Sequence, residues 1–87
     1  MVRYTVLWRK EVLNELADLW ISYHDRGELT AAADLIDAEL SSDAHQKGYS
    51  IGIGQKSLVS GPLSVIFRVD EGDRKVMVEG IGLTESN

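Results

Sequence analysis

The spacing of apolar residues changes twice along this chain of 87 residues. Residues 4–8 alternate, with Tyr4, Val6 and Trp8 on one side, and an alternating pattern predicts a strand. Residues 9–25 and 28–40 then repeat apolar positions at the spacing of amphipathic helices. From residue 55 onwards the alternating pattern returns. A chain with these changes of period is expected to pack helices against a sheet around one core.

The two helical segments are joined by a short link. Gly27 is a plausible stop for the first helix, and a link at residues 25–27 predicts an antiparallel helical hairpin. We expect Trp8, Trp20 and Tyr23 to be core aromatics beneath this hairpin. An exposed Trp20 would instead indicate a surface for a partner. The apolar stripe of the first helix consists of Val12, Leu16, Leu19 and Tyr23, widened by Leu13 and Trp20.

Glycines interrupt the middle of the chain. Residues 41–54 show no regular period, so this stretch is predicted to be a loop that enters a strand near Ile51 or Gln55. Beyond it, Gly61-Pro62 marks a turn and residues 70–73 form a polar hairpin loop. Three strands are predicted around these turns, at residues 55–60, 63–69 and 75–83.

The predicted order of elements is β-α-α-β-β-β. The sequence therefore predicts an α+β fold in which the helical hairpin packs on one face of an antiparallel meander sheet. The N-terminal strand is expected to join that sheet, because a lone apolar strand has nowhere else to pair. The length of the chain favours a single domain over residues 1–87.

Composition narrows the classes of function. The chain has no cysteine, which excludes disulfides and thiolate metal sites. Its net charge is −5, from 14 acidic and nine basic residues, and this opposes strong binding to free nucleic acid. No stretch approaches the roughly 20 apolar residues that span a bilayer. The first residues do not resemble a signal peptide, so a cytoplasmic protein without membrane contact is expected.

Neither a cofactor nor a metal ion is expected. Gly52-x-Gly54 lacks the third glycine and the following helix of a nucleotide-binding loop. Asp34, Asp37 and Glu39 have no nearby histidine, and their spacing is typical of a solvated helix face.

Five residues are candidates for a catalytic or binding role. One interpretation of the irregular segment is an acid–base histidine, a cation and a stacking aromatic beside the sheet; the other is a solvated loop whose tyrosine caps the core. Arg68 is either a phosphate contact on the open sheet face or an exposed arginine paired across strands with Glu79 or with the neighbours of Lys56. The candidates are His45, Lys47, Tyr49, Lys56 and Arg68.

Several motifs carry a resemblance to a known family. Near the N-terminus stands Tyr4-x-Val6-x-Trp8, and the second helix contains Ala32-x-x-x-Ile36-Asp37-x-x-Leu40. The most specific motif is Gly61-Pro62-Leu63-x-Val65-x-Phe67-Arg68-Val69-Asp70, followed by Arg74-x-Val76-x-Val78. Together they resemble the RelE/ParE superfamily of plasmid-stabilisation and type II toxin proteins, of which this chain looks like a divergent member.

The resemblance implies two branches of function. RelE-like members are ribosome-dependent endoribonucleases that use lysines and arginines on the sheet and a C-terminal tyrosine or histidine. ParE-like members lack that set and act on DNA gyrase. In both branches a cognate antitoxin binds and silences the toxin, so an antitoxin is the expected partner, with the ribosome or gyrase as a possible target.

This sequence departs from the pattern of the RNA-cleaving branch. Ser64 stands where those relatives often carry an arginine, and Lys56 is a single lysine in a strand that often carries paired basic residues. The last strand runs Gly80-Ile81-Gly82-Leu83-Thr84 without a following tyrosine or histidine. We therefore expect a toxin-like component that does not cleave messenger RNA. The alternatives are a noncatalytic protein-binding module on the same fold and a ribosome-dependent endoribonuclease.

Overall fold

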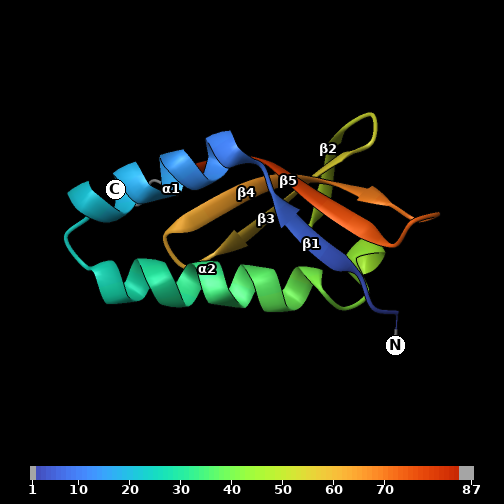
Figure 1. The fold of residues 1–87 in the computed structure, drawn as a ribbon, viewed down its shortest axis with the longest axis horizontal. Coiled ribbons are helices and arrows are strands. Elements are labelled where there is room, and N and C mark those ends of the chain that lie inside the picture. Colours follow the sequence, from blue (N-terminus) through green and yellow to red (C-terminus); the bar gives the residue numbers. More distant parts are fainter. Residues whose placement is uncertain (1, 85–87) are drawn as a thin grey trace.

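The computed structural model describes residues 2–84 and places two helices on one face of a five-stranded sheet (Figure 1). The helices are α1 (Lys10–Ser22) and α2 (Arg26–Leu40), and a 3₁₀ turn η1 (Ala44–Gln46) follows them. The strands are β1 (Thr5–Trp8), β2 (Tyr49–Gly52), β3 (Gln55–Ser60), β4 (Leu63–Asp70) and β5 (Lys75–Leu83). The predicted α+β class, with a helical hairpin on one sheet face, is confirmed.

The strand order in the sheet is β1-β5-β4-β3-β2. The strands from β2 to β5 form an antiparallel meander, and β1 joins it in parallel with β5, in a register that pairs Trp8 with Val78. The N-terminal strand therefore pairs as predicted. The meander, however, has four strands rather than three, because β2 forms within the segment that was predicted to be mainly loop.

The exposure of β2 explains why its sequence carries no strand signal. All four of its residues are exposed, so no alternation of apolar and polar residues was needed to build it. Gly54 adopts a φ of 73° at the tip that connects β2 to β3, a conformation that favours glycine. Of the glycines that suggested an irregular loop, Gly54 thus forms part of the tight turn of a hairpin, and Gly52 ends the strand before it.

The helix boundaries differ from the prediction at the link. α1 ends at Ser22, three residues before the predicted end at 25, and α2 begins at Arg26. Gly27 is not a helix stop but lies in the first turn of α2. Asp25 is the residue that starts α2, because its side chain accepts a hydrogen bond from the backbone N–H of Glu28 at 3.0 Å.

The core lies between the helices and the facing side of the sheet. Trp8 and Tyr23 are half-buried against it as predicted, but Trp20 is not a core residue, because 43% of it is exposed. Its indole N–H donates to Thr30 Oγ1 of α2 at 3.2 Å, and the Arg26 guanidinium lies 4.6 Å from its ring. The fully buried large side chains are Phe67, Leu29, Ile36, Leu40, Leu63, Val12, Val65, Val76 and Val78.

No helix within residues 2–84 combines the length and the apolar character that crossing a membrane requires.

Candidate functional site

A carboxylate occupies the open face of the sheet, the face without helices. The ladder between β4 and β5 is irregular: Phe67 pairs with Val78 but Ile66 pairs with Gly80, so Glu79 is an extra residue in β5. A bulge of this kind redirects a side chain. Here it places Glu79 beside Arg68 and below the start of α1, where Arg9 lies.

Glu79 binds three side chains from three parts of the chain. Arg9 Nη2 donates to its Oε2 at 3.2 Å, and Gln55 Nε2 donates to its Oε1 at 3.2 Å. Arg68 Nε lies 3.4 Å from both carboxylate oxygens. The Gln55 hydrogen bond is the main cause that lowers the pKa of Glu79; partial burial opposes it, and the two arginines reinforce it. Glu79 is therefore an anion that holds both arginines.

The rest of this face combines neutral and charged side chains. Ser64 pairs with Val59 and Gly82, so its neighbours across both strands are uncharged. A shallow hollow of about 380 Å³ lies beside Arg68, over β1, β4 and β5. It is lined by Leu7, Arg68, Val69, Asp70, Glu71, Lys75 and Met77.

A second polar cluster lies at the end of the sheet next to η1. The Tyr4 hydroxyl donates to Glu71 Oε1 at 2.7 Å and lies 2.9 Å from His45 Nδ1. Tyr4 has one phenolic proton, and it is donated to the Glu71 carboxylate. A hydrogen bond between His45 and the Tyr4 oxygen therefore requires that Nδ1 of His45 is the donor.

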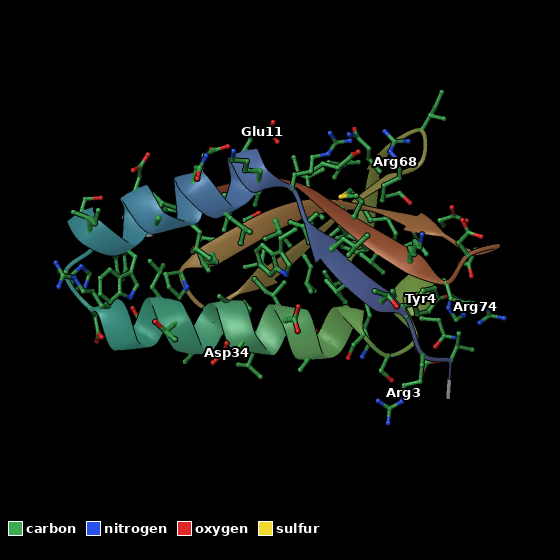
Figure 2. The ribbon with its side chains drawn as sticks, in the orientation of Figure 1. Arg3, Tyr4, Glu11, Asp34, Arg68 and Arg74 are labelled. Atoms are coloured by element: carbon green, nitrogen blue, oxygen red, sulfur yellow. The ribbon has the colours of Figure 1, made fainter. Side chains whose placement is uncertain are left out.

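Tyr4 is the buried centre of this cluster, with 6% of its surface exposed. Burial, followed by the hydrogen bond to Glu71, raises the pKa of its phenol, so the hydroxyl keeps its proton. Arg74 lies over the Tyr4 ring at 5.9 Å, and Figure 2 shows the two residues together at this end of the sheet, apart from Arg68.

Lys56 connects this cluster to the β2–β3 hairpin. Its ammonium group donates to the backbone carbonyl of His45 at 2.7 Å. Between the hairpin and η1 lies a cleft of about 210 Å³. The residues that line it are His45, Ser50, Gly52, Gly54, Gln55, Lys56, Val69 and Glu71.

The candidate site residues of the irregular segment do not all lie close together. His45 and Lys56 lie together at the cleft. Tyr49 pairs with Ser57, whereas the next residue, Ser50, pairs with Lys56, so the Tyr49 ring and the Lys56 side chain lie on opposite faces of the hairpin. Lys47 follows η1 and is half-buried.

The predicted cross-strand pairing of Arg68 with Glu79 is confirmed. Sequence reasoning did not find His45 and Glu71 as the two partners of the Tyr4 hydroxyl, because residues 41 and 67 positions apart meet only through the fold. Arg9 and Gln55 were missed as partners of Glu79 for the same reason. Within residues 2–84, no three histidine, aspartate or glutamate side chains gather closely enough to hold a metal ion.

The architecture is shared with solved structures. The RelBE2 toxin–antitoxin complex of Mycobacterium tuberculosis contains a chain that matches with a TM-score of 0.76 at 20% identity, over 99% of this chain and 97% of that one. A chain of the chromosomal ParDE system of P. aeruginosa matches with a TM-score of 0.68 at 20% identity, over 98% and 100%. The isolated E. coli RelE toxin matches with a TM-score of 0.61 at 15% identity, over 97% and 87%.

By sequence, no family profile matches this chain, and no curated protein does. The structural matches extend over nearly the whole chain, which is an α+β sandwich of a helical hairpin on a mixed sheet. The fold is RelE/ParE-like, as the motifs indicated.

Proposed function

We propose that this chain is the toxin-like component of a type II toxin–antitoxin pair, acts in the cytoplasm and does not cleave messenger RNA. The observation that carries the second part is the position of Glu79 between Arg9 and Arg68. Cleavage of RNA through its 2′-hydroxyl needs a base, an acid for the leaving oxygen and cations around the phosphate. A carboxylate that holds both arginines disfavours a phosphate at the same place.

The missing catalytic side chains reduce the expected rate of RNA cleavage further. Ser64 lies on the open face between Val59 and Gly82, where no side chain supplies a charge. Each missing catalytic group typically costs about 10²-fold or more in rate. Two or three such losses would leave an activity several orders of magnitude below that of a complete site.

An antitoxin is the partner that this role requires. Two of the similar structures are toxin–antitoxin systems by name, RelBE2 and ParDE, which supports such a partner here. The exposed apolar side chains of α1 support it independently. Leu13 and Trp20 are seven residues apart and so lie on the same side of α1, and Trp20 reaches Thr30 of α2. An amphipathic helix could bury both against the helical hairpin.

The same surface supports a second candidate function, a noncatalytic binding module. Leu13 and Trp20 would then bind a protein partner without any toxic target. The two functions differ in what the free chain does in a cell, and this difference can be measured.

The test is expression of the chain in a bacterial host, alone and together with the small open reading frame adjacent to its gene. Growth arrest that the adjacent product relieves would support the toxin-like role. Growth that is unaffected at high expression would count against it and favour the binding module. If growth stops, a gyrase supercoiling assay and pulse-labelling of new protein separate a gyrase target from a translational one.

A further inference from the structure

The negative charge of this chain is concentrated in the helical hairpin. Residues 10–40, which form α1, the link and α2, contain eight acidic residues and two basic ones, a net charge of −6. The rest of the chain contains six acidic and seven basic residues, a net charge of +1. The net charge of −5 therefore comes from the helical layer and not from the sheet.

The carboxylates of the hairpin are not neutralised by the chain itself. The two ion pairs within residues 2–84 both use Glu79, which lies in β5. Where side chains contact a hairpin carboxylate, they are neutral donors. The Trp8 indole N–H donates to Asp37 Oδ1 at 3.0 Å, and the Tyr23 hydroxyl donates to Glu28 Oε1 at 3.0 Å. The negative charge is therefore left for a partner to balance.

The two basic residues of the hairpin lie at its ends. Arg26 donates to the backbone carbonyls of Trp20 and Ile21 at 3.1 and 3.4 Å, so its guanidinium satisfies the end of α1. Lys10 is the first residue of α1, and within residues 2–84 it forms no ion pair. Residues 27–40, which form most of α2, contain no lysine or arginine.

An apolar stripe on α1 lies beside an acidic stripe on α2. Leu13 and Trp20 are 49% and 43% exposed, and the indole N–H of Trp20 donates to Thr30 Oγ1, so this side of α1 faces α2. Thr30, Asp34 and Asp37 are four and three residues apart, a spacing that places them together on α2. Both aspartates are exposed, and Figure 2 shows Asp34 at the surface of the helix.

We propose that the segment which covers this surface is a basic amphipathic helix. Its apolar side chains pack on Leu13 and Trp20, and its lysines or arginines lie on the side that faces Asp34 and Asp37. The inference rests on the proposed antitoxin partner and specifies the sign of the charge on its binding segment.

Other occupants fit the surface less well. A second copy of the hairpin would bring two layers of net charge −6 together, which like-charge repulsion opposes. An acidic helix or a nucleic acid would be repelled for the same reason. A neutral helix would cover the apolar stripe but would leave the carboxylates of Asp34 and Asp37 without cationic partners.

The probe is a fluorescein-labelled fifteen-residue helical peptide with leucines at helical spacing, lysines beside them and alanine elsewhere. Fluorescence anisotropy with the full chain measures its binding, and we expect saturable binding that weakens as salt is added. The matched peptide with glutamine in place of lysine should bind about three- to tenfold more weakly, the size of two exposed ion pairs. The matched peptide with glutamate should show no saturable binding.

Variants of the protein locate the site. Asp34→Asn combined with Asp37→Asn should remove the preference for lysine over glutamine, and asparagine keeps an acceptor for the Trp8 indole. Leu13→Ser should weaken the lysine and glutamine peptides by the same factor, because both use the apolar stripe. Circular dichroism of each variant confirms that the fold is intact.

The control is a second pair of substitutions, Asp70→Asn combined with Asp73→Asn. It removes the same charge from the β4–β5 turn, and asparagine at 70 keeps an acceptor for the backbone N–H of residue 73. We expect this variant to retain the preference for the lysine peptide.

Four results would overturn the proposal. They are no saturable binding of the lysine peptide, binding of the glutamine or glutamate peptide as tight as that of the lysine peptide, a preference for lysine that survives Asp34→Asn with Asp37→Asn, and equal losses in the two double variants. A dimer in sedimentation that Leu13→Ser dissociates would assign the surface to a second copy instead. The growth assay uses none of these peptides, so growth arrest that the adjacent product relieves, together with a preference for the glutamate peptide, would keep the toxin-like role and overturn only the charge of the partner.

Discussion

At the scale of single residues, Glu79 has the largest effect on the charge of the open sheet face, because it pairs with Arg9 and Arg68. It is 17% exposed at the side chain, whereas its partners Arg9 and Arg68 are about half exposed. A surface ion pair alone contributes little to stability. In the proposed function, a carboxylate with three donors has the larger effect on anion binding, because it competes with any other anion for the two arginines.

Replacing Glu79 with glutamine should therefore create affinity for RNA. The change removes a negative charge and releases Arg9 and Arg68, so we expect a single-stranded RNA oligomer to bind about three- to tenfold more tightly at low salt, with a steeper salt dependence. Filter binding or anisotropy measures this. Glu15→Gln on α1 makes the same change of charge away from this face, and an equal gain in that variant would contradict the role assigned to Glu79.

The pH dependence of stability provides a second test of the same residue. The folded-state pKa of Glu79 is lowered from 4.5, so its carboxylate stabilises the fold above about pH 4.5, and this stabilisation is lost as the pH falls through the folded-state value. Glu79→Gln should be less stable than the wild type by about 1 kcal/mol at pH 7, and the gap should close as the pH falls through the folded-state pKa of Glu79. Urea unfolding across this range measures it. A gap that is constant with pH would show that the ionised carboxylate is not the cause.

Tyr4 connects the N-terminus to η1 and to the β4–β5 turn through its hydroxyl. Tyr4→Phe keeps the buried ring but leaves His45 and Glu71 without their shared partner, so the melting temperature should fall by about 4–8 °C. Tyr23→Phe is the matched control, since the Tyr23 hydroxyl donates to Glu28 at the surface, at 3.0 Å. A loss in Tyr23→Phe as large as that in Tyr4→Phe would contradict the structural importance of the Tyr4 cluster.

At the scale of elements, the parts that bury apolar surface were predictable and the others were not. The alternation in 63–69 and 75–83 identified β4 and β5, because their inner residues are fully buried. β2 was predicted only as a loop that enters a strand near Ile51 or Gln55, because it is exposed on both faces and lies between glycines. The polar clusters were only partly predictable: Arg68 and Glu79 are neighbours across a hairpin, whereas Tyr4, His45 and Glu71 meet only in three dimensions.

The start of α2 was present in the sequence but was not recognised. Asp25 three residues before Glu28 is a common helix-start pattern, and the structure shows Asp25 capping Glu28. Asp25→Ala should destabilise the protein by about 1 kcal/mol in urea unfolding. Asp34→Ala, on the exposed face of the same helix, should change stability by less than about 0.5 kcal/mol. Equal effects of the two substitutions would rule out a capping role for Asp25.

At the scale of the whole molecule, a shared architecture is combined with an open face on which one carboxylate pairs with two arginines. The helical hairpin and the five-stranded sheet match toxin structures over nearly the whole chain, at 20% identity or below. Such a likeness concerns the fold, which depends on the buried side chains. The open face depends on exposed ones, and there Ser64 contributes a neutral hydroxyl while Glu79 pairs with Arg9 and Arg68.

The most direct test of this combination is a cleavage assay on translating ribosomes. Purified chain is added to a reconstituted translation reaction, and the messenger RNA is mapped by primer extension, with the E. coli RelE toxin as the positive control. We expect intact messenger RNA with this chain, at concentrations where the control cuts completely. Cuts that depend on both the ribosome and this chain would contradict the proposal that the Glu79 network and Ser64 leave the open face without nuclease activity.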